Sequence, residues 1–197
     1  MEIVLASGNK GKLKELQSKL GHLADFVAQS SFGLETPEET GSTYLENAIL
    51  KARFVSEQTG LPALADDSGL SVDYLDGAPG IYSARFAGEE ATDQENNDKL
   101  LVSLQGVPHI DRGAAFHCVL ALVYPNDKPD PILCEGIWRG KIFEAPRGKN
   151  GFGYDPLFQP DGMECASAEL SPKHKNQISH RGKAMSMLAS RLTEQDD

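Results

Sequence analysis

The chain has 197 residues, of which 40% are hydrophobic, and its formal net charge is −10 at pH 7. This length and composition allow a full buried core and predict a single domain over residues 1–197, with room for two lobes. The acidic excess argues against sequence-independent binding of nucleic acid, which needs a basic face. A small anionic ligand remains compatible with it if the cations are gathered locally.

Cysteine usage and hydropathy predict the compartment. Cys118, Cys134 and Cys165 are odd in number and have no CxxC spacing, so neither a disulfide framework nor a zinc site is indicated. The N-terminus reads directly into a strand without a signal peptide, and no apolar run has membrane length. We therefore expect a cytoplasmic protein with no membrane partner.

The first feature in chain order is a strand, a glycine-bearing turn and a helix. Residues 1–6 predict a buried strand, and Leu13, Leu16 and Leu20 predict an amphipathic helix that ends at Gly21. Backbone N–H groups at such a helix start can bind an anion. Lys12 lies in the first turn, where a cation is unfavourable unless an anion is near. An ordinary turn with exposed lysines is the alternative.

An acidic loop with Glu38 and Glu39 leads into a second helix. Thr43-x-x-Glu46 is typical of a capping box. Lys51 falls on the side opposite the apolar stripe, and by itself it is expected to be solvated, as are the two loop acids. The predicted buried stripe consists of Leu45, Ala48, Ile49, Ala52 and Val55.

The central stretch, residues 61–70, is an apolar run that ends in Asp66, Asp67, Ser68 and Gly69. Side chains alternate along a strand, so the two acids converge only if the chain turns, and Gly69 is expected to supply that turn. At about 4 Å their repulsion is about 4 kcal/mol with an effective dielectric near 20. A divalent cation or a shared proton relieves it. An Asx turn without a metal is the alternative.

The middle of the chain alternates helix and strand signals. Thr92-x-x-Glu95 predicts another capped helix, whose Leu100, Leu101 and Leu104 pack inward. Residues 114–123 and 132–138 predict two strands that pair antiparallel, and residues 140–143 predict one more.

The C-terminal third holds a glycine-rich loop, residues 148–156, and a last helix that opens with His180 and Arg181. Phe152 or Tyr154 can stack on a flat ring, although aromatics that plug the core are the alternative. Positive charge at the start of this helix repeats the misfit seen at Lys12. Together these features predict Mg²⁺-dependent phosphoanhydride chemistry on a nucleotide.

Six short motifs in register carry a family resemblance. They run in order from residue 7 to residue 182 and resemble those of the inosine/xanthosine triphosphate pyrophosphatase family, with Ser7 where threonine is usual. The motifs are Ser7-Gly8-Asn9-x-x-Lys12, Glu46-Asn47-Ala48-x-x-Lys51-Ala52, Ala65-Asp66-Asp67-Ser68-Gly69-Leu70, Pro79-Gly80-Ile81-Tyr82-Ser83-Ala84-Arg85, Gly151-Phe152-Gly153-Tyr154-Asp155-Pro156 and Ser179-His180-Arg181-Gly182.

The resemblance implies an α/β fold, with a long mixed β-sheet and two α/β lobes flanking a central active-site cleft, in a homodimer. The reaction it implies is NTP + H₂O → NMP + pyrophosphate, by attack of water at the α-phosphorus, with Mg²⁺ as cofactor. The substrates would be ITP, dITP, XTP and dXTP.

The resemblance also implies roles around the central acids. Asp67 would be the general base or the metal-bound activator of water, and Ser68 would contact the substrate. Lys51 would contact a phosphate. The implied triphosphate cradle consists of Ser7, Gly8, Asn9, Lys10, Gly11 and Lys12.

The implied metal ligands are Asp67 and a loop glutamate. Counting back without gaps from Lys51 selects Glu39 over Glu38, and Asp66 would support the metal without binding it directly.

The implied base pocket would favour a purine with oxygen at C6. A donor such as Arg181 pairs with that oxygen and is left unpaired by adenine. The implied pocket residues are Phe152, Gly153, Tyr154, Asp155, Lys175, His180 and Arg181.

A nucleotide kinase or transferase and a non-catalytic nucleotide sensor are the alternatives to a hydrolase.

Overall fold

The computed structural model describes residues 1–195. Five α-helices and six β-strands are assigned within this range, with short 3₁₀ turns between them. No helix in it is long and apolar enough to cross a membrane. The strands are β1 (Glu2–Leu5), β2 (Asp25–Ala28), β3 (Ala63–Val72), β4 (Gly113–Val123), β5 (Ile132–Ile142) and β6 (Phe158–Pro160). The helices are α1 (Lys10–Leu20), α2 (Tyr44–Thr59), α3 (Asp93–Ser103), α4 (Pro172–Ile178) and α5 (His180–Gln195).

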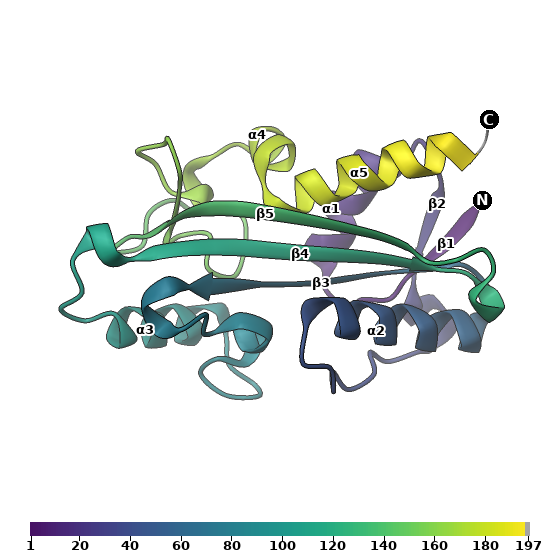
Figure 1. The fold of residues 1–197 in the computed structure, drawn as a ribbon, viewed down its shortest axis with the longest axis horizontal. Helices are drawn as coiled ribbons and strands as arrows, with labels where there is room; N and C mark the ends of the chain where they lie inside the picture. Colours follow the sequence, from purple (N-terminus) through teal and green to yellow (C-terminus); the bar gives the residue numbers. More distant parts are fainter. Residues whose placement is uncertain (196–197) are drawn as a thin grey trace. The chain divides into compact units, whose positions relative to one another are not determined.

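The strands form one mixed sheet in the order β2-β1-β3-β4-β5-β6. Strand β1 pairs in parallel with β2 and β3, whereas β5 and β6 are antiparallel. The central strands β3, β4 and β5 are the longest, with 10 or 11 residues each (Figure 1). The expected α/β class with a long mixed sheet is therefore confirmed.

The chain forms two compact units. Unit 1 comprises residues 1–67, 118–136 and 181 to the end of the described chain, and unit 2 comprises residues 68–117 and 137–180. The boundaries fall inside β3, β4 and β5, so each of these strands supplies residues to both units.

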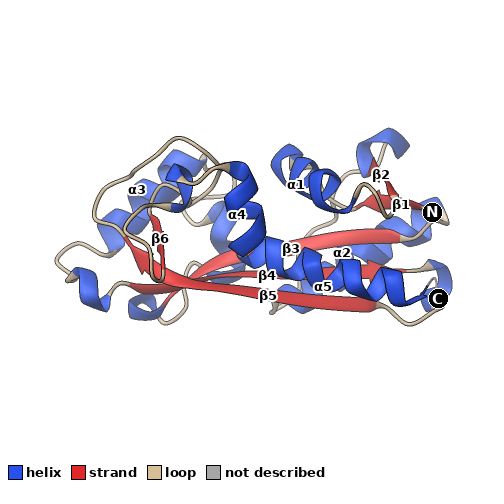
Figure 2. Cartoon of the chain, turned by 90° about the horizontal axis from the view of Figure 1, so that it is seen from above, coloured by secondary structure: helices blue, strands red, loops and turns tan. Residues whose placement is uncertain are grey.

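Unit 1 has a core on each face of its sheet. Ile3 and Leu5 of β1 belong to one apolar cluster and Val4 to another, as the two-residue period of a strand requires. Helices α1 and α5 supply the first cluster and α2 supplies the second. Figures 1 and 2 accordingly show α1 and α5 on one side of these strands, with α2 on the other.

Unit 2 has a single apolar cluster around the aromatic side chains of Phe116, Trp138 and Phe158. Phe158 packs at an angle against both partners, with ring centroids 4.6 Å from Phe116 and 5.2 Å from Trp138. Leu100 of α3 and Leu104, the residue that follows this helix, join the cluster as the pattern predicts, whereas Leu101 is only partly buried.

Several local predictions are corrected by the structure. The chain does not turn at Gly69, because β3 continues to Val72. Residues 132–142 form one strand, β5, rather than two. Leu45 is 41% exposed and lies outside the buried stripe of α2. Only half of the capping box at Thr43 is present, since the Glu46 carboxylate accepts hydrogen bonds from Ser42 instead.

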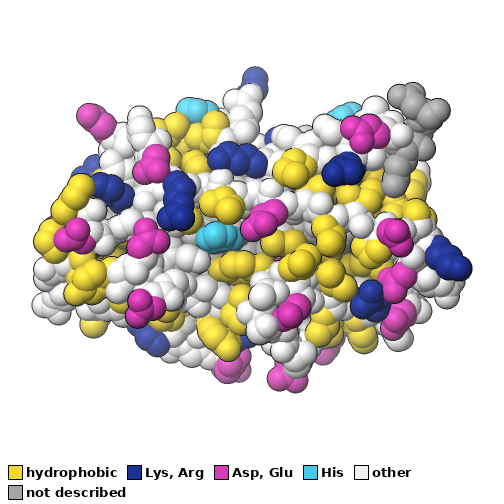
Figure 3. Space-filling view, viewed as in Figure 1, with side chains coloured by type: hydrophobic (Ala, Val, Ile, Leu, Met, Phe, Trp, Pro, Cys, Tyr) yellow, Lys and Arg dark blue, Asp and Glu magenta, His cyan; other side chains and the backbone are white. Residues whose placement is uncertain are grey.

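The surface of the face drawn in Figure 3 mixes both signs of charge. Lysine and arginine side chains are interspersed there with aspartate, glutamate and apolar side chains. Interspersed charges give weaker long-range attraction for a polyanion than a cluster of one sign.

Candidate active site

Asp66 and Asp67 point to opposite faces of β3, because the strand continues through both of them. Each carboxylate meets its own cations. Asp66 contacts Lys12 and Arg181, whereas Asp67 contacts Lys51. The predicted repulsion is thus relieved by separating the acids, and not by bringing both to one metal ion.

Asp66 lies at the centre of a buried ion-pair cluster and is 1% exposed. Its Oδ1 lies 2.6 Å from Lys12 Nζ, and its Oδ2 accepts a 2.6 Å hydrogen bond from Arg181 Nε. Cys118 Sγ also donates to Oδ2, at 3.4 Å, and Arg181 Nη1 donates to Glu15 at 2.7 Å. Burial raises the pKa of Asp66, but the charges of Arg181 and Lys12 outweigh it and hold this pKa well below its usual range.

This cluster explains why two helices can begin with cationic residues. Lys12 in the first turn of α1 and Arg181 in the first turn of α5 share one anion, and it is Asp66 of the protein itself. The helix-dipole misfit therefore does not by itself call for a polyanionic ligand.

Asp67 and Glu39 share the ammonium group of Lys51. Nζ lies 2.6 Å from Asp67 Oδ1 and 2.7 Å from Glu39 Oε1, and it also donates to the Asp66 carbonyl at 3.2 Å. Lys51 is 3% exposed, so the expectation that it is solvated is wrong. The neighbouring Glu38 is exposed.

Burial raises the pKa of Asp67 to about 6, although the Lys51 charge opposes this shift and the Glu39 charge adds to it. Burial also lowers the pKa of Lys51, but the charges of Asp67 and Glu39 outweigh it, and the net shift is upward. Within one strand, Asp66 is thus held ionised while Asp67 can gain a proton near neutral pH. Environments that separate two acids in this way are typical of acid–base sites.

The start of α1 is already capped. Asn9 Oδ1 accepts hydrogen bonds from the backbone N–H groups of Gly11 and Lys12, at 2.9 and 3.1 Å. Ser7 Oγ accepts one from Asn9 N. Gly8 and Lys10, the other residues of the predicted cradle, are exposed. An anion at this helix start has to compete with the Asn9 side chain.

The predicted base-pocket loop lies in unit 2 and is organised by Asp155. Its Oδ2 accepts from Phe152 N at 2.9 Å and from Lys175 Nζ at 2.5 Å, and its Oδ1 accepts from Ser167 Oγ. Lys175 Nζ also lies 5.0 Å from the centre of the Phe152 ring. Gly151 has φ +79°, and a Cβ there would lie 2.0 Å from Asp155 Oδ2, so this turn requires glycine.

The two aromatics of this loop differ. Tyr154 is buried in the unit 2 core, and its hydroxyl donates to the Ser83 carbonyl at 2.8 Å. Phe152 is half-buried, so it is the better placed of the two to meet a ring. His180 is buried and stacks on Phe116 with centroids 4.7 Å apart.

The structure brings the sequence-predicted residues together in two groups. Arg181, predicted for the base pocket, lies in unit 1 with Asp66, while Ser68 is half-buried in β3 directly after Asp67. The group in unit 1 contains Lys12, Glu39, Lys51, Asp66, Asp67 and Arg181. The group in unit 2 contains Phe152, Gly153, Tyr154, Asp155 and Lys175.

Two residues of α3 that the sequence did not single out hold Gly153 by both of its backbone groups. Gly153 N donates to Asp93 Oδ2 at 2.6 Å, and Asn97 Nδ2 donates to the Gly153 carbonyl at 2.9 Å. Their only signal in the sequence is their place one turn apart after the Thr92 cap. Asp93 and Asn97 therefore fix the path of the predicted base-pocket loop.

Comparison with known proteins identifies the family. The model of the Ham1 family matches residues 3–191. This chain belongs to the Ham1 family.

Individual relatives match almost the whole length of the chain. A protein of Vibrio cholerae named dITP/XTP pyrophosphatase is 56% identical over 98% of both chains, and one of Pseudomonas syringae with the same name is 59% identical over 97% of this chain and 96% of its own. The structure of a HAM1 protein from Coxiella burnetii matches with a TM-score of 0.91 at 52% identity, covering 98% of this chain and 99% of the other. The resemblance drawn from the six motifs is confirmed.

The donor chemistry of this Ham1 chain fits a magnesium ion. Asp67 and Glu39 are carboxylates that converge on one cation, and Mg²⁺ is commonly held by one or two carboxylates together with substrate phosphates and water. No cluster of three or more His, Cys, Asp or Glu side chains fit for a metal occurs among residues 1–195. Both carboxylate oxygens of Asp66 are already engaged by protein cations, Lys12 and Arg181.

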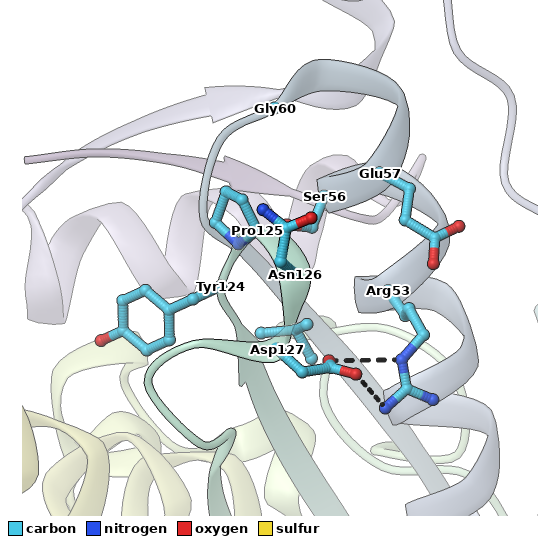
Figure 4. A pocket seen from close by; sticks show the side chains of 9 residues that line it. Arg53, Ser56, Glu57, Gly60, Tyr124, Pro125, Asn126 and Asp127 are labelled. Carbon is cyan, nitrogen blue, oxygen red and sulfur yellow. Dashed lines mark hydrogen bonds and ion pairs between the residues drawn. The ribbon is translucent and has the colours of Figure 1, made fainter.

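Unit 1 contains a cavity of about 250 Å³, and Figure 4 shows the side chains that line it. It is formed by the C-terminal half of α2 and the turn after β4, where Arg53 pairs with Asp127. Its lining contains none of the residues predicted for catalysis, metal or substrate.

We expect Asp66→Asn to lower the free energy of unfolding by about 3–5 kcal/mol, because it leaves the buried cations Lys12 and Arg181 without their shared counter-charge. The matched control is Asp127→Asn, which breaks an ion pair about half exposed on each side and should cost less than about 1 kcal/mol. Denaturant unfolding measures both. Equal effects of the two substitutions would contradict the assignment of Asp66 as a buried anchor.

We expect the Asp67 carboxyl of the metal-free protein to titrate with a midpoint near 6, well above the ordinary value of 3.8. Because the folded pKa is raised, Asp67 contributes stability below the unfolded pKa, and this contribution is lost as the pH rises through the folded pKa. Carbon-13 NMR of the carboxyl, assigned with Asp67→Asn, measures the midpoint. A midpoint at the ordinary value would show that burial does not control this acid.

Proposed function

We propose that this chain hydrolyses non-canonical purine nucleoside triphosphates, ITP, dITP, XTP and dXTP, to the monophosphate and pyrophosphate. The observation that carries the proposal is the Asp67–Lys51–Glu39 cluster in a Ham1 chain whose relatives, over 50% identical, are named dITP/XTP pyrophosphatase. In this proposal residues 1–197 act as one pyrophosphatase domain with two lobes, working as a cytoplasmic homodimer.

The reaction needs an activated water and a neutralised triphosphate. Asp67 and Glu39 would hold Mg²⁺, which when bound offsets phosphate charge and lowers the pKa of a water molecule. The Asp67 carboxylate would accept the proton of the attacking water, and its pKa near 6 leaves it mostly ionised at neutral pH. Release of pyrophosphate from the α-phosphorus completes the exchange of one phosphoanhydride bond for one P–O bond to water.

The remaining residues would bind the nucleotide. Ser7 to Lys12, with Lys51 and Ser68, would contact the phosphates. Phe152 would contact the face of the base, and the loop held by Asp155 and Lys175 would shape the pocket, with Gly153, Tyr154, His180 and Arg181 as its other members. Donors aimed at a C6 oxygen would select against adenine, which leaves them unpaired.

We expect pyrophosphate to be the product when the protein is incubated with Mg²⁺ and ITP, dITP or XTP, and much slower release from ATP and GTP. Separate assays for pyrophosphate and orthophosphate distinguish the reactions. Orthophosphate as the product would reject attack at the α-phosphorus. Binding without any product would identify a nucleotide sensor instead, and transfer to a second substrate would identify a kinase or transferase.

We expect Asp67→Asn to reduce turnover of ITP by at least about 100-fold, because the amide cannot accept the proton of the water. Binding of metal-free ITP should be retained, since the substitution removes a negative charge that faces the phosphates. Rapid-quench kinetics and calorimetry measure the two properties. Asp25→Asn, an exposed acid on β2, is the control, and unchanged turnover in Asp67→Asn would place the base elsewhere.

A further inference from the structure

Each of the three N–H donors of the Lys51 ammonium group already has an acceptor nearby. It carries three N–H groups, and three acceptors surround it: Asp67 Oδ1 at 2.6 Å, Glu39 Oε1 at 2.7 Å and the Asp66 carbonyl at 3.2 Å. Lys51 is almost completely buried. It therefore cannot donate to a phosphate oxygen unless it first releases one of these acceptors.

The two carboxylates that Lys51 bridges are the same ones proposed to hold the metal. A divalent cation bound by both carboxylates would lie next to the Lys51 ammonium group. Two cations at such a short separation repel each other strongly in a buried site. The Lys51 ammonium and a divalent cation are thus alternatives at the Asp67–Glu39 pair.

The surroundings allow Lys51 to leave. Its head group is carried on a flexible four-carbon stem, so it can move without a change in α2. The Asp66 carbonyl keeps a second donor, Lys12 Nζ at 3.3 Å, when Lys51 departs. Glu39 lies in a segment without regular secondary structure. This segment is linked to α2 by a hydrogen bond of 2.8 Å, which Gly41 N donates to Asn47 Oδ1.

We propose that Lys51 is the resident counterion of the Asp67–Glu39 pair and exchanges with the divalent cation, so that metal binding releases the ammonium for the triphosphate. This inference rests on the proposed function, which brings metal and triphosphate to the same residues. By linkage, a metal ion that displaces Lys51 strengthens phosphate binding, and phosphate that captures Lys51 strengthens metal binding by the same factor.

The first test is a titration of the nucleotide-free protein with Mn²⁺ at about pH 8, where Asp67 is ionised. The electron paramagnetic resonance signal of free Mn²⁺ reports binding. We expect Lys51→Met to bind Mn²⁺ about tenfold more tightly than the wild type, because its competitor is gone. Arg53→Met removes one cation from the same helix without touching either carboxylate and should match the wild type. Unchanged or weaker Mn²⁺ binding in folded Lys51→Met overturns the exchange.

A second test does not depend on the folding of Lys51→Met. Glu39→Gln weakens one of the three contacts of Lys51 and should strengthen metal-free binding of pyrophosphate several-fold, as measured by calorimetry. Glu38→Gln removes the same charge from the same segment, but its side chain is exposed, and it should have a smaller effect. Equal affinities in the two variants would show that charge alone, and not release of Lys51, controls phosphate binding.

Neither titration measures hydrolysis, so the two proposals fail separately. If pyrophosphate is released from ITP but Lys51→Met binds Mn²⁺ no more tightly, the exchange is wrong and the proposed function stands. If Mn²⁺ and Lys51 exchange but no nucleotide is hydrolysed, the proposed function is wrong.

Discussion

Asp66 is a carboxylate almost without access to solvent, and its charge is tolerated because Lys12 and Arg181 contact it from α1 and α5. Three elements that are far apart in the sequence are held together by this one acid. The cluster adds little net stability compared with an apolar core of the same shape, but each member depends on the others. The ion pair with Asp66 therefore fixes the position of the Lys12 ammonium group, which is a predicted phosphate ligand.

The two-residue period of β3 then gives the neighbouring acid a different environment. Asp67 contacts Lys51 of α2, which also contacts Glu39 of the segment before that helix. Burial raises the pKa of Asp67, whereas the charges of Arg181 and Lys12 lower that of Asp66. Two adjacent residues of one type thus acquire separate roles, one holding the structure and the other able to exchange a proton.

Unit 2 contains a glycine-rich loop whose conformation is fixed by hydrogen bonds. The loop from Gly151 to Asp155 is held in part by hydrogen bonds between side chains and backbone, including those of Asp93 and Asn97 to both backbone groups of Gly153. Such a loop would lose little conformational freedom on binding a ligand, as the proposed base pocket requires.

The sequence by itself determined the α/β class, the main helices and strands, and the family, because hydrophobic period, caps and ordered motifs are local properties. It also predicts Asp66 and Asp67 as the centre of the candidate site. It could not show that Lys51 is buried, that the Lys51 ammonium contacts the Glu39 carboxylate, or that Asn97 holds Gly153. Those facts depend on contacts between elements distant in the chain.

The limit of what the sequence alone can predict is clearest at Asp66 and Gly69. The stretch 61–70 predicts two acids and a turn, but the turn is overridden by pairing of β3 within the sheet, and the acids separate to opposite faces. The cationic helix starts at Lys12 and Arg181 are visible in the sequence, whereas the anion they share is not. Only the tertiary structure decides which charge neutralises which, because a buried charge must be paired in space and sequence spacing does not specify the partner.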